Sequence, residues 1–127
     1  MTRNQHSAVT AVLEDYLEGL FHGDTRRLRR VFHPRAIYAS PSEHPLLYRT
    51  MEEYFPEVEA RPVPSETGDT RDDEQLLSIE FGSDDMAFAR VTCGFLGKRF
   101  TDFLTLVRED GRWQIISKVF HAETANN

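Results

Sequence analysis

The first clear pattern along the chain is helical and lies between Ser7 and Phe21. Apolar side chains recur there at every third or fourth position, at Val9, Val12, Leu13, Tyr16, Leu17, Leu20 and Phe21. This spacing is the period of a helix that buries one face. His22-Gly23 is expected to end this helix, because glycine readily takes the left-handed conformation at a helix C-terminus.

A second, short helix is predicted directly afterwards. Asp24 offers a side-chain oxygen to cap the segment TRRLRRVF. Pro34 cannot continue that helix, so the chain should turn away there and leave His33 at a corner. Residues Ala36 to Ala39 then form a plausible short strand.

A third helix is predicted from Met51. Thr50 and Glu53 have the spacing of a capping box, in which each side chain bonds the backbone of the other residue. Pro56 lies within this helix and can shorten or kink it. The stretch from Arg61 to Asp73 is rich in Pro and Gly and is expected to be a loop rather than a linker between domains.

The second half of the chain changes to a period of two, which predicts strands. The alternating positions are Leu77, Ile79 and Phe81, then Ala87, Ala89, Val91, Cys93 and Phe95, then the hairpin arms 100–108 and 112–122. Helices followed by antiparallel strands indicate an α+β fold, and residues 1–127 are expected to form one domain. Three helices are too few to fill a strongly curved sheet, so we expect a pocket between helices and sheet.

Two charged residues interrupt the apolar arms of this hairpin, Asp102 in the first arm and Lys118 in the second. A two-residue turn at Asp110-Gly111 would place Asp102 opposite Val119 and Lys118 opposite Phe103. A three-residue loop with the glycine in a left-handed bulge position would place the two charges directly opposite each other. Because an unpaired buried charge is costly, the paired register is favoured, with both charges on the helix-facing side.

The favoured register sorts the apolar residues of the hairpin onto two faces. Phe100, Leu104, Ile116 and Phe120 share the face of the charge pair, and the opposite face carries Phe103, Val107, Trp113, Ile115 and Val119. The second set is too large an apolar patch to leave in water. A homodimer that buries this outer face of the sheet about a two-fold axis is therefore expected.

Composition and charge narrow the possible partners. The net charge of −6 and the pI near 5.3 disfavour a polyanion such as nucleic acid, and the basic run Arg26, Arg27, Arg29 and Arg30 lacks interleaved aromatic residues. Cys93 is the single cysteine, so an internal disulfide is impossible. Nowhere does the chain approach the ~18 apolar residues of a membrane span. We therefore expect a cytoplasmic protein that binds neither nucleic acid nor membrane.

Three phrases of the chain carry a family resemblance. They are YLEGLFHGDTRRLRRVFHP at 16–34, ARPVPSETGD at 60–69 and FTDFLTLVREDGRWQIISKVFHA at 100–122. In this order they resemble the SnoaL-like, nuclear-transport-factor-2-like (NTF2-like) superfamily, and within it the "putative lumazine-binding" branch. The resemblance implies a cone-shaped fold in which a bent sheet wraps around helices. Relatives of this kind include isomerases, cyclases, dehydratases, hydrolases and non-catalytic binding modules, so the fold alone does not choose an activity.

The expected pocket gathers candidate catalytic groups. Asp102 beside a lysine would be ionised and could act as the base that removes a proton next to a carbonyl. Tyr16, from the inward face of the first helix, or Lys118 would then stabilise the enolate oxygen. His33, at its corner, is a further candidate. The superfamily's isomerases and cyclases use similar chemistry.

Three residues of the last strand are candidate ligand-binding residues. Lys118 and Phe120 share the helix-facing side, whereas His121 alternates to the opposite face and reaches the pocket only if a bulge turns it inward. Plain structural roles compete with these assignments. The charge pair could only fix the register, His33 could merely bond the backbone, and Tyr16 could be a core residue with a wet hydroxyl.

The sequence contains no pattern for a metal or a cofactor. The histidines have no HExxH or i, i+4 spacing, and a dinucleotide fingerprint, a phosphate loop and a Ser-His-Asp arrangement are missing. We therefore expect a protein that binds a small organic molecule. If it is an enzyme, we expect a cofactor-independent isomerase, cyclase or dehydratase that acts on a partly apolar carbonyl compound. The alternative is a non-catalytic ligand-binding, dimerisation or protein-interaction module.

Overall fold

The computed structural model describes residues 2–125 and has three α-helices and six strands. The helices are α1 Arg3–His22, α2 Thr25–Val31 and α3 Met51–Ala60, followed by a 3-10 turn at Pro64–Glu66. The strands are β1 Phe32–Ser40, β2 Leu47–Thr50, β3 Gln75–Ser83, β4 Met86–Phe95, β5 Lys98–Glu109 and β6 Arg112–Thr124.

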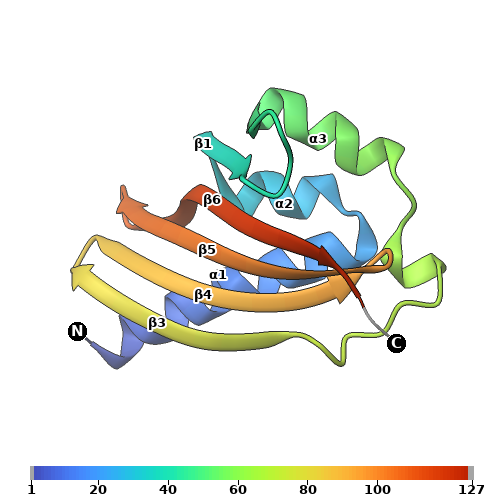
Figure 1. Ribbon diagram of the computed structural model, residues 1–127. Coiled ribbons are helices and arrows are strands. Elements are labelled where there is room, and N and C mark those ends of the chain that lie inside the picture. Colours follow the sequence, from blue (N-terminus) through green and yellow to red (C-terminus); the bar gives the residue numbers. More distant parts are fainter. Residues whose placement is uncertain (1, 126–127) are drawn as a thin grey trace.

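All six strands form one sheet in the order β2-β1-β6-β5-β4-β3. The β1–β6 pair is parallel and every other neighbouring pair is antiparallel. Figure 1 shows the long strands β3 to β6 curving together, with α1 behind them and with α2 and α3 on the side of β1. The predicted α+β cone, with a bent, mainly antiparallel sheet around the helices, is confirmed. None of the helices within residues 2–125 is long and apolar enough to cross a membrane.

Local signals set the ends of the first two helices. α1 begins at Arg3, earlier than its apolar pattern, because the Thr2 hydroxyl accepts a hydrogen bond from the Gln5 amide at 3.1 Å. Gly23 ends it in the left-handed conformation, with φ of 60°. The Asp24 side chain then caps α2, as predicted.

The regions around the second and third helices show two differences from prediction. The capping box of Thr50 and Glu53 is present, but α3 continues through Pro56 to Ala60 instead of being shortened there. β1 begins at Phe32, so the expected corner at His33 is part of a strand, and a register shift between Phe32 and Ile37 absorbs the proline.

The register of the β5–β6 hairpin was predicted wrongly. Glu109 faces Arg112 across a two-residue turn in which Asp110 and Gly111 both have positive φ, 53° and 75°. Further along the hairpin, Leu106 pairs with Ile115 and the next pair is Thr105 with Ser117. Ile116 therefore has no partner on β5 and forms a bulge.

The tight turn and the bulge together determine the cross-strand partners of Asp102 and Lys118. Asp102 faces Phe120, and Lys118 faces Leu104. The charges are therefore diagonal neighbours rather than direct partners. Both are nonetheless buried on the helix-facing side, as predicted.

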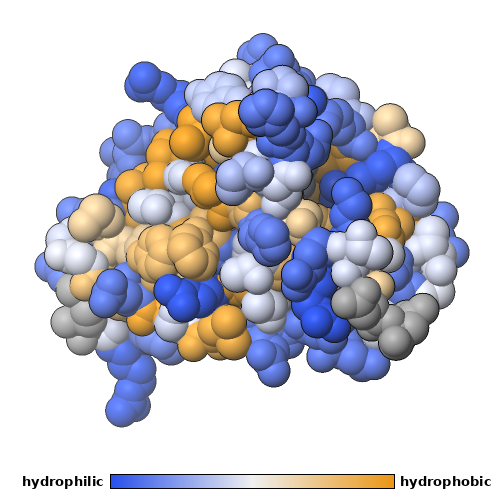
Figure 2. Space-filling view, viewed as in Figure 1, coloured by the Kyte–Doolittle hydropathy of each residue, from blue (hydrophilic) through white to orange (hydrophobic). Residues whose placement is uncertain are grey.

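The bulge also corrects the predicted outer face of the sheet. One extra residue reverses the alternation of side chains along β6. Trp113 and Ile115 therefore point inward and are 6% and 0% exposed, whereas Phe103 and Val119 remain outside at 42% and 40%. Figure 2, viewed from the sheet side, shows hydrophobic side chains on this surface among hydrophilic ones.

Candidate functional site

Tyr16, Asp102 and Lys118 meet inside the cone, and we call these three residues the inner cluster. They come from α1, β5 and β6. The Tyr16 hydroxyl donates a hydrogen bond to Asp102 Oδ2 at 2.5 Å, and Lys118 Nζ lies 4.0 Å from the same oxygen. Tyr16 and Asp102 are both 0% exposed, so their polar atoms interact with each other instead of with water.

Lys118 is surrounded by aromatic rings. Its ammonium nitrogen lies 5.1 to 5.2 Å from the ring centroids of Tyr16, Tyr38 and Phe120, which is cation–π range. Burial lowers the pKa of Lys118, but the negative charge of Asp102 and neighbouring tyrosines oppose this and leave the pKa raised overall. Lys118 is therefore a permanent cation facing Asp102.

Tyr16 acts as a neutral donor in this cluster. Burial, and then the nearby Asp102 charge, raise the pKa of Tyr16 well above its usual value. The phenol therefore keeps its proton and holds Asp102 Oδ2 in place. Burial likewise raises the pKa of the Cys93 thiol, with a further contribution from Asp102, so this buried cysteine is protonated.

Two polar atoms at the inner cluster have no partner. Asp102 Oδ1 and the Tyr54 hydroxyl are buried without a hydrogen bond within residues 2–125. Tyr54 stacks on Tyr38 at 4.2 Å between ring centroids, so it belongs to the aromatic surroundings of Lys118. Buried polar groups are nearly always bonded, so two unbonded polar atoms in one place are unusual.

A cavity of about 460 Å³ opens at the C-terminal end of β6, and we call it the C-terminal cavity. Its aromatic lining is Tyr38, Phe95, Phe100 and Phe120, and its charged lining is Glu43, Arg49, Glu57, Arg61, Lys98 and Glu123. Tyr38 and Phe120 also contact the Lys118 ammonium. These two rings therefore form the boundary between the C-terminal cavity and the inner cluster.

His33 does not join the inner cluster. Its Nε2 lies 3.0 Å from Glu109 Oε1, and its Nδ1 accepts a hydrogen bond from the Arg35 amide at 3.0 Å. Phe32 is buried in the core, so the next residue of the strand points the other way. His33 lines a separate depression on that side.

His121 belongs to neither the inner cluster nor the lining of the C-terminal cavity, although its neighbours Ser42 and Glu123 line that cavity. Its Nδ1 is 3.1 Å from the Ser42 hydroxyl, and 61% of its side chain is exposed. A bulge does occur in β6, but it precedes Lys118 and therefore leaves His121 on the face opposite to Lys118 and Phe120. His121 was expected to reach the pocket only if a bulge turned it inward, and the observed bulge does not do so.

Three residues at these sites were not predicted from the sequence: Arg61, Tyr38 and Tyr54. The period-two spacing of Ala36 and Tyr38 in the predicted short strand could have indicated an inward Tyr38. The helical spacing of Met51, Tyr54, Phe55 and Val58 could have indicated the buried face of α3. No local signal marks Arg61, because the side chain reaches the cavity only through the packing of α3 on the sheet.

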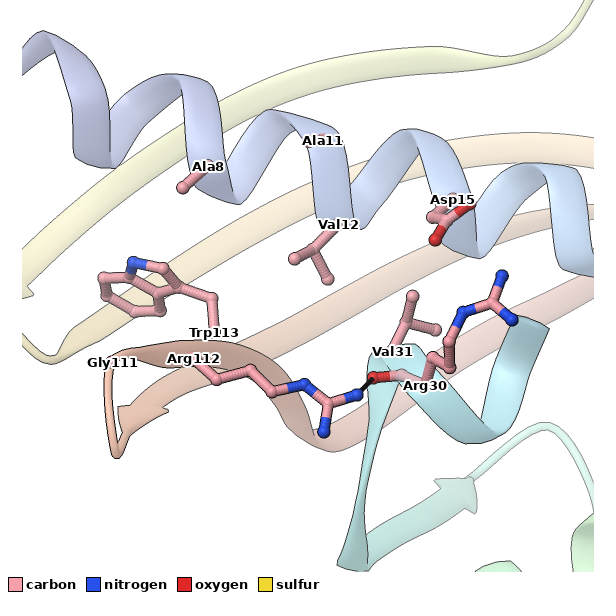
Figure 3. Close-up of a pocket in the computed structure, with 9 residues that line it drawn as sticks. All are labelled: Ala8, Ala11, Val12, Asp15, Arg30, Val31, Gly111, Arg112 and Trp113. Atoms are coloured by element: carbon pink, nitrogen blue, oxygen red, sulfur yellow. Dashed lines mark hydrogen bonds between the residues drawn. The ribbon is translucent and has the colours of Figure 1, made fainter. Parts of the chain in front are cut away.

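A second hollow, of about 400 Å³, lies between α1 and the turn into β6, and we call it the turn hollow. Figure 3 shows Trp113 and Val12 facing it and Arg112 reaching along its edge to donate to the backbone oxygen of Arg30 at 2.7 Å. The turn hollow lies at the start of β6, whereas the C-terminal cavity lies at its end. None of the predicted site residues lines it. Across residues 2–125, no three His, Cys, Asp or Glu side chains come together as a metal site.

Solved structures with the same fold cover nearly the whole chain. An NTF2-like protein of unknown function from Silicibacter pomeroyi DSS-3 is 28% identical, with 97% of this chain and 100% of that chain covered and a TM-score of 0.78. A similar protein from Shewanella baltica OS155 is 23% identical, with coverage of 98% and 99% and a TM-score of 0.78. A structure described as a putative scytalone dehydratase, from Novosphingobium aromaticivorans DSM 12444, is 16% identical, with coverage of 96% and 88% and a TM-score of 0.65.

Sequence comparison adds a short match and a long one. The aldolase FrzH of Cladobotryum sp is 61% identical over 23 residues, so the match spans only 18% of each chain. The family described as "Putative lumazine-binding" matches residues 4–121, which include the whole inner cluster. The chain therefore belongs to the putative lumazine-binding family of NTF2-like proteins.

Proposed function

We propose that this protein binds a small, partly apolar organic molecule in the C-terminal cavity. The observation that carries the proposal is a cavity of about 460 Å³ whose inner wall, Tyr38 and Phe120, also holds the buried Lys118 ammonium. Ligand pockets are typically about 300 to 1,000 Å³, mostly apolar, with a few placed polar groups. The name of the family supports a small ligand as well.

A second candidate function is cofactor-independent acid–base chemistry of the isomerase, cyclase or dehydratase type on a carbonyl compound. The free, buried Oδ1 of Asp102 favours it. Tyr16 occupies Oδ2, so Oδ1 would be the base that removes a proton next to the carbonyl. The Lys118 ammonium would stabilise the resulting enolate oxygen, and Tyr16 would position Asp102.

This chemistry requires the substrate to pass Tyr38 and Phe120, because Asp102 itself does not line the cavity. The two rings would part as the carbonyl end enters. His33 and His121 take no part in the proposal, since their ring nitrogens face Glu109 and Ser42. The 23-residue match to a protein named an aldolase is a further, short point of support for carbonyl chemistry.

The binding proposal is tested by filling the C-terminal cavity. Ala122 lines it, and Ala122→Trp should remove any small molecule that native mass spectrometry finds on the purified wild-type protein. Ala11 lines the turn hollow, so Ala11→Trp is the matched control and should retain the molecule. Retention by Ala122→Trp, or loss only from Ala11→Trp, would contradict the proposal.

We also propose that the protein is a cytoplasmic homodimer that pairs through the outer face of its sheet. Met86, Phe103 and Val119 expose 47%, 42% and 40% of their surface there, and Phe88 packs edge-on against Phe103. A second copy would cover this patch with the same surface. If the protein only pairs and binds no ligand, the non-catalytic alternative is the correct function.

A further inference from the structure

Arg61 contributes to the wall of the C-terminal cavity. The residue caps the C-terminus of α3, and its guanidinium carbon lies 5.4 Å from the centroid of the Phe95 ring. Its Nε and Nη2 atoms are enclosed by protein and have no hydrogen-bond partner within residues 2–125. A buried guanidinium donor without a hydrogen bond costs folding free energy. The presence of two such donors on Arg61 therefore suggests that a partner from outside the chain binds this residue.

The acidic residues of the cavity do not supply that partner. Glu57 Oε2 accepts a hydrogen bond from Arg49 Nε at 2.8 Å, and Glu123 lies 3.8 Å from His121 Nε2. The neighbouring cation Lys98 lines the same cavity. Arg61 is thus left without an acidic partner at the wall of a cavity that also contains the aromatic lining.

We infer that the ligand of the C-terminal cavity carries a carboxylate that binds Arg61, with its apolar body against Phe95, Phe100 and Phe120. This rests on the proposed binding function and names its ligand class. A planar guanidinium matches a carboxylate with two parallel hydrogen bonds. A phosphate fits less well, because the C-terminal end of α3 and the three glutamates of the lining disfavour a second negative charge.

Matched acids and amides test this inference. Aromatic monocarboxylates and their primary amides, beginning with 2-naphthoate and 2-naphthamide, are titrated against the protein by calorimetry. We expect the acids to bind at least about tenfold more tightly than the amides. Arg61→Gln should remove this preference, and Arg61→Lys, which keeps the charge but loses the fork, should retain part of it.

Arg108→Gln is the control, because Arg108 lines a different depression and is bonded to Asp85. It should leave the preference for acids nearly unchanged. Equal binding of acids and amides by the wild type, or an undiminished preference in Arg61→Gln, would overturn the carboxylate site and leave the cavity proposal standing. Binding of neither series would overturn both.

The stability of the ligand-free protein gives an independent readout. If Arg61 awaits a ligand, Arg61→Met removes an uncompensated charge and should raise the melting temperature by a few degrees. A purely structural Arg61 would give the opposite sign. A lower melting temperature in Arg61→Met would therefore overturn the inference.

Discussion

The two oxygens of Asp102 have different surroundings, and this difference matters most at the scale of single residues. Oδ2 accepts the Tyr16 hydrogen bond and lies near Lys118, whereas Oδ1 has no partner within residues 2–125. One oxygen is thus fixed by the protein and the other is left for a ligand or substrate. Under the proposed acid–base chemistry, stability and activity would depend on the same carboxylate.

Replacing Asp102 alone should be strongly destabilising. Asp102→Asn leaves Lys118 as an uncompensated buried charge, which typically costs roughly 3 to 5 kcal/mol of unfolding free energy. The double variant Asp102→Asn/Lys118→Met removes both charges and should recover most of that loss. Urea denaturation measures both values. A double variant as unstable as the single one would show that the charge pair is not the source of the effect.

Alkaline pH should destabilise the protein. The pKa values of Lys118 and Tyr16 are raised in the folded state, and that of Tyr38 is raised to about 12. Above about pH 10 these groups lose protons first in the unfolded chain, so the folded state binds more protons and its stability falls as the pH rises.

The test is the free energy of unfolding from urea titrations between about pH 8 and pH 12. We expect full stability at the lower end and a progressive loss above pH 10. The Asp102→Asn/Lys118→Met variant should show a shallower fall, because it lacks the Lys118 titration and the charge that acts on Tyr16. A wild-type profile that stays flat across this range would contradict the account.

At the scale of elements, the hairpin shows what the sequence could and could not predict. The strands, the helix caps and the turn residues Asp110-Gly111 were readable from local spacing. The bulge was not, because Ile115 and Ile116 are both apolar, so no polar side chain marks the point where the alternation reverses. The register, and with it the direction of Trp113, followed from the two-residue turn together with that one unmarked position.

The turn itself is open to mutation. Gly111 has φ of 75° with no atom near the position of an added Cβ, so Gly111→Ala should cost about 1 to 2 kcal/mol of unfolding free energy through backbone strain alone. Asp110→Asn should be tolerated, because asparagine also favours this turn. Chemical denaturation of the two variants measures the difference. Equal stabilities would indicate a different turn geometry in solution.

At the scale of the whole molecule, the cone has distinct ends and faces. The C-terminal cavity and the turn hollow lie at opposite ends of β6, and the outer sheet face carries the exposed apolar patch. The fold was predictable from helical period and alternation. The meeting of Asp102 and Lys118 was expected from a wrong register and in fact results from the tight turn together with the bulge. Arg61 was not predictable, since it enters the cavity only through long-range packing.

The proposed dimer depends on this outer face. Phe103→Glu places a charge at the centre of the patch and should turn a dimer into a monomer in light scattering at micromolar concentration. Arg26→Glu, exposed on helix α2, is the control for added negative charge and should leave the dimer intact. A wild-type protein that is already monomeric would refute the dimer and leave the ligand proposal untouched.

The most direct test of small-molecule binding is an NMR map of the protein with and without 2-naphthoate. We expect shifts to gather at Tyr38, Phe95, Phe100 and Phe120, which line the C-terminal cavity, while the indole N–H signal of Trp113 in the turn hollow stays in place. Shifts confined to Trp113, Ala8 and Ala11, with none at the four aromatic residues, would contradict the account.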